Sequence, residues 1–95
     1  MIIGTCELEL HLPEANSLKG KRSVIKSMLS RMRNTFNVSA AEIDRQDVWQ
    51  SAVIGIVTVT NSSIHADESL THVINWIEGN YPWVIIVRET REIIT

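Results

Sequence analysis

Hydrophobic and polar residues alternate along the first segment of the chain. Between residues 2 and 12, the even positions are apolar or small and most odd positions are polar. A period of two with one apolar side is typical of a strand that is buried on one face. Pro13 ends this pattern, and residues 13–17 predict a loop.

The pattern then changes to the period of a helix. Apolar residues recur about every 100° around a helical axis over residues 18–36, and Ser17 is a suitable N-cap. A short strand is predicted at residues 38–43, followed by a polar stretch that suits a tight turn. Residues 49–60 contain a nearly continuous β-branched run. Such a run predicts a central strand that is buried on both faces.

A second helix and a fourth strand complete the predicted order of elements. Residues 61–63 supply N-cap candidates, Gly79 is a stop signal, and residues 83–94 return to a strand pattern. No linker or repeat interrupts residues 1–95, which predicts a single α+β domain. The order βαββαβ predicts a ferredoxin-like plait, with a four-stranded antiparallel sheet of order 4-1-3-2 and two helices on one face. This fold hosts many unrelated activities, so it says little about function.

Composition narrows the class of protein. Hydrophobic residues make up 44% of the chain and charged residues 21%, which is ordinary for a globular protein. The single cysteine, Cys6, lies on the apolar side of the first strand, and we expect a buried, inert thiol. No apolar run approaches the roughly 18 residues of a membrane helix, and the N-terminus lacks the pattern of a signal peptide. We therefore expect a cytoplasmic protein without a membrane partner.

The basic residues are concentrated in the first helix. Six of the nine fall within positions 19–33, and no acidic residue lies between Glu14 and Glu42. Such a segment is where a phosphate-rich partner would bind. The candidate phosphate contacts are Lys19, Lys21, Arg22, Lys26 and Arg33. The alternative is a solvated helix face whose long side chains cover the edge of the core.

A helical wheel divides this basic segment. Arg22, Lys26 and Arg33 form a stripe beside the apolar side, with Lys19 close by. Arg31 lies well away from the stripe. Lys21 falls near the apolar side unless the first turn is irregular.

Several other chemistries find no support in the sequence. The first strand has no aromatic residue for base stacking, and it places Glu7 and Glu9 on its solvent side. His65 and His72 would lie about 10.5 Å apart along a helix, too far to share one zinc ion. No Ser or Cys is paired with a base, and the four glycines form no phosphate-binding motif. We therefore expect no metal, no cofactor and no enzymatic activity, with an enzyme of unrecognised type as a remaining alternative.

Two motifs carry a resemblance to a known family. The sequence SLKGKR at residues 17–22, followed by FNVSAAE at residues 36–42, resembles the YlxP-like family of small bacterial proteins. The similarity continues through Asp44, Gln46, Asp47, Trp49 and Gly55 and covers nearly the whole chain. The resemblance implies a ferredoxin-like domain of unknown function. The family's genes often lie near those for transcription, translation-initiation and ribosome-maturation factors, which implies a role around RNA or the ribosome.

One position departs from the family pattern. The family commonly has Glu where this chain has Gly20, and that Glu would complete a capping box with Ser17. We therefore expect either a looser first turn or a regular helix that begins nearer Ser23.

Two hypotheses of function follow. The first is a non-enzymatic protein that associates with RNA or the ribosome through its basic first helix. The second is a homo-oligomeric structural module, most simply a dimer. In that case a second subunit would cover the side of the third strand that the helices leave bare, at Val53, Val57 and Val59.

Overall fold

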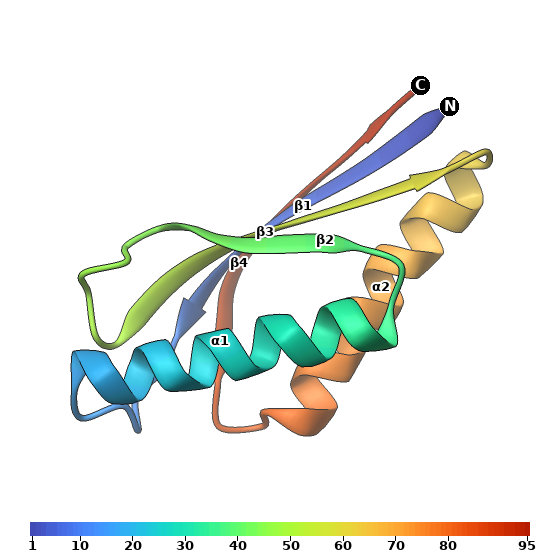
Figure 1. Cartoon of the computed structure of the whole chain (residues 1–95). Helices are drawn as coiled ribbons and strands as arrows, with labels where there is room; N and C mark the ends of the chain where they lie inside the picture. Colours follow the sequence, from blue (N-terminus) through green and yellow to red (C-terminus); the bar gives the residue numbers. More distant parts are fainter.

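The computed structural model describes all residues, 1–95, and contains the six elements that the sequence predicts. In chain order they are β1 (Ile2–His11), α1 (Leu18–Thr35), β2 (Ser39–Asp44), β3 (Ser51–Thr60), α2 (Ser63–Asn80) and β4 (Ile85–Ile94) (Figure 1). The predicted bounds agree with these to within about two residues.

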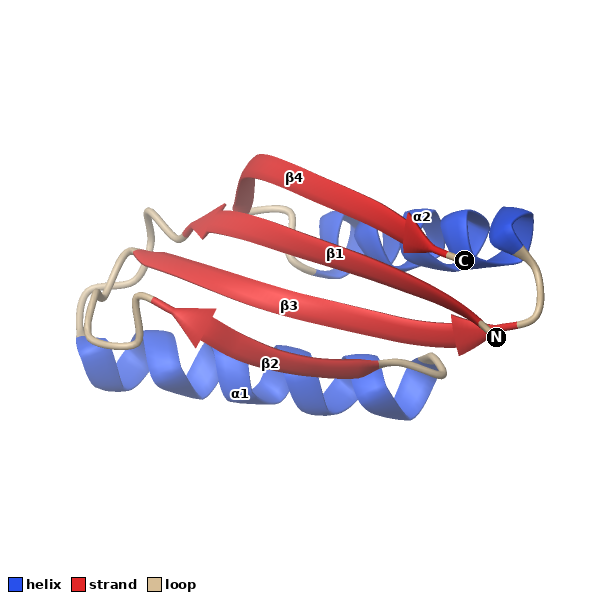
Figure 2. Cartoon of the chain, turned by 90° about the horizontal axis from the view of Figure 1, so that it is seen from above, coloured by secondary structure: helices blue, strands red, loops and turns tan.

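The strands form one antiparallel sheet in the order β2-β3-β1-β4, which is the predicted order read from the other edge. Both helices pack on the same face, and the opposite face is open (Figure 1). Figure 2 shows α1 running along β2 and α2 lying on the side of β4. The predicted α+β plait is therefore confirmed.

The core lies between the sheet and the two helices. Leu8 and Leu10 of β1, Ile54 of β3 and Met28 of α1 are completely buried there. Cys6 is also buried, as the alternation predicted. Burial raises the pKa of its thiol from 9.0 to about 11, and the nearby Glu89 carboxylate adds to the shift.

The expectation that β3 is buried on both faces is wrong for the single chain. Val57 and Val59 are 39% and 54% exposed, because both helices cover the opposite face. The sequence of β3 does not alternate between apolar and polar residues, because several of its outward positions are also apolar.

The first turn of α1 is regular, contrary to the expectation for Gly20. The helix begins at Leu18, and the Ser17 hydroxyl accepts a hydrogen bond of 2.9 Å from the Gly20 N–H. The N-cap therefore forms without the carboxylate of a capping box, since one hydroxyl suffices to bind an N–H of the first turn.

Candidate nucleic-acid interface

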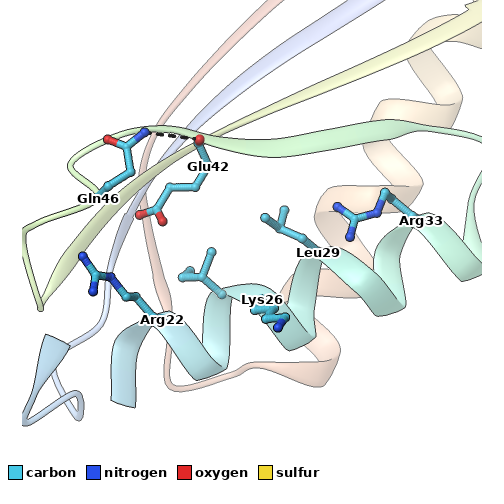
Figure 3. A pocket seen from close by; sticks show the side chains of 7 residues that line it. Arg22, Lys26, Leu29, Arg33, Glu42 and Gln46 are labelled. Carbon is cyan, nitrogen blue, oxygen red and sulfur yellow. Dashed lines mark hydrogen bonds between the residues drawn. The ribbon is translucent and has the colours of Figure 1, made fainter. Parts of the chain in front are cut away.

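A groove runs between α1 and β2, with a volume of about 340 Å³. Buried Ile25 and Leu29 of α1 form its apolar floor. Arg22, Lys26 and Arg33 extend along its helical side (Figure 3). The opposite side is formed by Glu42 of β2 and Gln46 of the following turn, and Gln46 Nε2 donates a hydrogen bond to the Glu42 carbonyl.

Helical spacing accounts for the alignment of the basic side chains. Arg22 and Lys26 are four residues apart, Arg33 follows seven residues later, and Lys19 precedes Arg22 by three. These spacings place all four on one side of a helix. All four are exposed, and the row they form, here called the basic row, spans about 21 Å along the axis. Since α1 contains no acidic residue, nothing on the helix itself neutralises the row.

The members of the basic row differ in how far they are engaged within the protein. No carboxylate lies within ion-pair distance of Lys19 or Lys26. Arg22 pairs with Asp47 at 3.2 Å, but both side chains are exposed, and such pairs contribute only about 0–1 kcal/mol. Arg33 donates one hydrogen bond of 2.9 Å to the Ala40 carbonyl and has further guanidinium N–H groups. The basic row can therefore still bind an external anion.

Lys21 does not belong to this interface, which corrects the set of residues predicted from the sequence. Its side chain is 0% exposed, and its ammonium lies 2.6 Å from Glu42 Oε2. The ammonium also donates a hydrogen bond of 2.7 Å to the Arg45 carbonyl. Because the first turn of α1 is regular, Lys21 points toward the core side and cannot reach a phosphate.

This buried lysine connects α1 to the turn between β2 and β3. Arg45 occupies the left-handed region with φ of 62°, and its N–H donates a 2.8 Å hydrogen bond to Asp44 Oδ1. Its carbonyl accepts hydrogen bonds from both Lys21 and the Val48 N–H. Its guanidinium donates to Glu9 and to Ser51 on the sheet. Lys21 therefore neutralises Glu42 beneath the groove and holds the turn against the helix.

Arg31 lies on another side of α1, as the helical wheel predicted. Its guanidinium stacks over Trp76 and Tyr81 at 5.4 Å from each ring centroid. It also donates to the Tyr81 hydroxyl and to Asn80 Oδ1. This basic residue therefore joins the two helices.

Trp49 is a feature that the sequence analysis did not assign to a site. It is exposed, and it lies in the same loop as Asp47, which contacts Arg22. An exposed aromatic residue in a loop that contacts the basic helix is a candidate platform for base stacking. The residues around Trp49 predict only a turn. The sequence contains no signal for the contact between this loop and α1, because that contact joins segments that are distant in the chain.

The three valines of the predicted oligomer interface do not form one patch on the outer face of the sheet. Val57 and Val59 lie near Ile3, which pairs with Val59 across the strands. Val53 instead lines a polar hollow of about 220 Å³, together with five charged residues and one threonine, namely Glu7, Glu9, Asp44, Arg45, Arg88 and Thr90. Val53 is therefore separated from Val57 and Val59 by its polar surroundings.

The structure contains no evident metal centre and no membrane-spanning helix. No group of three or more His, Cys, Asp or Glu side chains lies close enough together to hold a metal ion, although His65 and His72 line one hollow. Neither helix is long and apolar enough to cross a membrane.

Comparison with known proteins places the chain in a family. The model of a family described as "Protein of unknown function (DUF503)" matches residues 3–90. The chain is also 42% identical over 78 residues to the "Uncharacterized protein YlxP" of Bacillus subtilis (strain 168). This match covers 82% of the chain and 85% of the relative. The chain therefore belongs to the YlxP-like family of uncharacterised proteins.

Proposed function

We propose that this protein is a non-enzymatic RNA-binding protein that docks the basic row of α1 on backbone phosphates. The observation that carries the proposal is the row itself: Lys19, Arg22, Lys26 and Arg33 are exposed on one side of a helix without an acidic residue. Long-range attraction of a polyanion requires such clustering of one sign of charge, and the net charge of −2 conceals it.

The geometry favours contacts to phosphate over contacts to bases on the sheet. The outer face carries Glu7 and Glu9 on β1, and it has none of the central aromatic residues on which RNA-recognition motifs stack bases. Negative charge at that position repels phosphate. The basic row lies on the helical layer, where the nearby Glu42 carboxylate is paired with buried Lys21 and Asp47 forms only an exposed pair with Arg22.

The number of cations sets the expected dependence on salt. Neutralising four phosphates of a single strand should give a slope of about −2.8 in log affinity against log salt, at roughly 0.7 per phosphate. Fluorescence anisotropy with single-stranded and structured RNA across a salt series measures this slope. Binding no tighter than about 0.1 mM at low salt, or a flat response to salt, contradicts the proposal.

Substitutions within one helix provide the matched comparison. The triple variant Lys19→Gln, Arg22→Gln, Lys26→Gln leaves only Arg33 of the basic row, so its slope should fall to about −0.7. Arg31→Gln removes a positive charge from the same helix, on the side packed against Trp76 and Tyr81. It should leave the slope unchanged when measured under conditions in which circular dichroism shows the variant to be folded. If Arg31→Gln lowers the salt slope by as much as each charge removed in the triple variant does, the whole helix attracts RNA non-specifically.

A further inference from the structure

The two edges of the sheet differ in how their backbone groups are protected. At the β2 edge, side chains reach the strand's carbonyls: Arg33 binds the Ala40 carbonyl and Gln46 binds the Glu42 carbonyl. β2 is also only six residues long and lies beside α1. Natural proteins protect exposed edges in such ways, because an unprotected edge pairs with another strand.

The β4 edge is less protected: it has a β-bulge at Val87, where its pairing with β1 shifts register, and charged side chains along residues 88–92. β4 is ten residues long and pairs with β1 on one side only (Figure 2). Arg91 donates hydrogen bonds to the carbonyl and carboxylate of Asp67 and the Thr71 hydroxyl on α2, and to the Glu89 carboxylate within the strand. None of these bonds reaches a backbone group of β4. The strand also exposes Val87 and Ile94 near its two ends. A long, open edge with apolar ends favours the addition of a further strand.

The sequence of β4 is complementary to itself in antiparallel orientation. Residues 87–93 read Val-Arg-Glu-Thr-Arg-Glu-Ile. When two copies pair about a two-fold axis at Thr90, Arg88 lies opposite Glu92 of the other copy. Glu89 lies opposite Arg91, and the β-bulge at Val87 lies outside this charged stretch. Every charged residue in this register faces the opposite charge, and opposite charges stabilise cross-strand pairs.

Other registers lose this complementarity. A shift of the centre by one residue, to Glu89 or to Arg91, places that residue opposite its own copy and so pairs like charges. Placing the axis between two residues pairs an outward side chain with an inward one and mismatches the faces of the two sheets. In the Thr90 register, Arg88 and Glu92 gain most. The Arg88 side chain is 75% exposed and comes no closer than 3.9 Å to a carboxylate, that of Glu9. Glu92 forms no ion pair within the chain.

We infer that a second copy of this chain pairs with the β4 edge, antiparallel about a two-fold axis at Thr90, to form a continuous eight-stranded sheet. This goes beyond the proposed RNA-binding function and uses a different surface. It also replaces the outer-face valines as the site of self-association. The outer faces of both copies remain open in this dimer, and the two basic rows lie at opposite ends because α1 runs along β2.

Charge reversal tests the register. Arg88→Glu and Glu92→Arg each place like charges opposite each other twice in the symmetric dimer. Each should raise the dissociation constant of the dimer at least about tenfold. An equimolar mixture of the two variants should dimerise again, because the two acidic side chains of one variant, at positions 88 and 92, then face the two basic side chains of the other. The double variant Arg88→Glu, Glu92→Arg should also dimerise, since it exchanges the two charges.

Sedimentation velocity at about 5–100 µM, without RNA, distinguishes the outcomes, with circular dichroism as a check on folding. The wild-type chain should sediment at twice its mass of 10.7 kDa. Val59→Glu, a control that places a charge on the outer face, should leave the dimer intact. A wild-type monomer throughout this range overturns the inference. A dimer that resists both charge reversals but is broken by Val59→Glu also overturns it, in favour of the outer face. Lys26→Gln leaves the dimer unchanged, so failure of RNA binding and failure of dimerisation are separable.

Discussion

Replacing Lys21 by methionine tests the assignment of this lysine to the interior. Methionine keeps most of the aliphatic stem and removes the ammonium. The change leaves the Glu42 carboxylate, which is 14% exposed, without its cation. It also removes one of the two hydrogen bonds to the Arg45 carbonyl, the other coming from Val48. The β2–β3 turn therefore loses its buried link to α1 and keeps only the exposed pair between Arg22 and Asp47.

The expected loss of stability follows from the burial of this pair. Removing one partner of a buried ion pair costs about 3–5 kcal/mol, because the remaining charge is desolvated and unpaired. Glu42 keeps some access to water, so the lower end of this range, about 3 kcal/mol, applies. A loss of this size should lower the melting temperature by roughly 12–24 °C in a domain of this length. It is a large part of the roughly 5–15 kcal/mol that stabilises a typical domain.

Urea unfolding followed by circular dichroism measures the free energy of unfolding of each variant. Lys26→Met is the matched control, since it removes the same group from an exposed position of the same helix and should change stability by no more than about 0.5 kcal/mol. The double variant Lys21→Met, Glu42→Leu should recover much of the loss, because it removes both charges together.

Two results would refute this assignment. One is a Lys21→Met protein within about 0.5 kcal/mol of the wild type, which would mean that the pair is solvated or absent. The other is a folded Lys21→Met protein whose salt slope for RNA falls by about 0.7, as expected for the loss of one phosphate contact. Lys26→Met should show the opposite combination, with normal stability and a reduced slope.

Two further predictions concern Trp49 and Cys6. Trp49→Ala should weaken binding to single-stranded RNA about tenfold, since a base–aromatic stack contributes about 1–3 kcal/mol, and should leave binding to duplex RNA unchanged; anisotropy titrations in which both RNAs lose affinity equally would rule out stacking. Because burial raises the pKa of Cys6 to about 11 from an ordinary 9.0, the folded state retains the thiol proton between these values while the unfolded state loses it. The free energy of unfolding should therefore fall as the pH rises through this window, by about 1.4 kcal/mol per pH unit at most. Urea unfolding at pH 8 to 10.5 should show a smaller decline in the free energy of unfolding for Cys6→Ala than for the wild type. The same dependence of this free energy on pH in both proteins would contradict the prediction.

The proposed RNA binding and the inferred dimer would reinforce each other. A dimer through β4 carries two basic rows, so a sufficiently long RNA can engage both at once. Linked binding events of this kind raise overall affinity without any new contact. The charge-reversed variants at Arg88 and Glu92 provide the comparison, because they should retain the basic row and lose the second site.

Periodicity in the sequence was sufficient to predict the elements and their order in the sheet. The alternation in β1 and the helical repeat of α1 each arise from local geometry, so they are visible in a short window of residues. The same reasoning separated Arg31 from the stripe of Arg22, Lys26 and Arg33, because angular position on a helix depends only on spacing. It also placed Cys6 in the core.

Contacts between distant segments decided the composition of the candidate site. Lys21 and Glu42 are far apart in the chain, and only the packing of α1 against β2 brings the ammonium to 2.6 Å from the carboxylate. The local pattern of β3 did not show its open outer side, since apolar side chains on both faces resemble a fully buried strand; the predicted fold, with both helices on one face, did indicate it. The sequence alone therefore determined the fold and the positively charged helix. The tertiary structure determined which of its cations face solvent, because burial and pairing depend on residues that are remote along the chain.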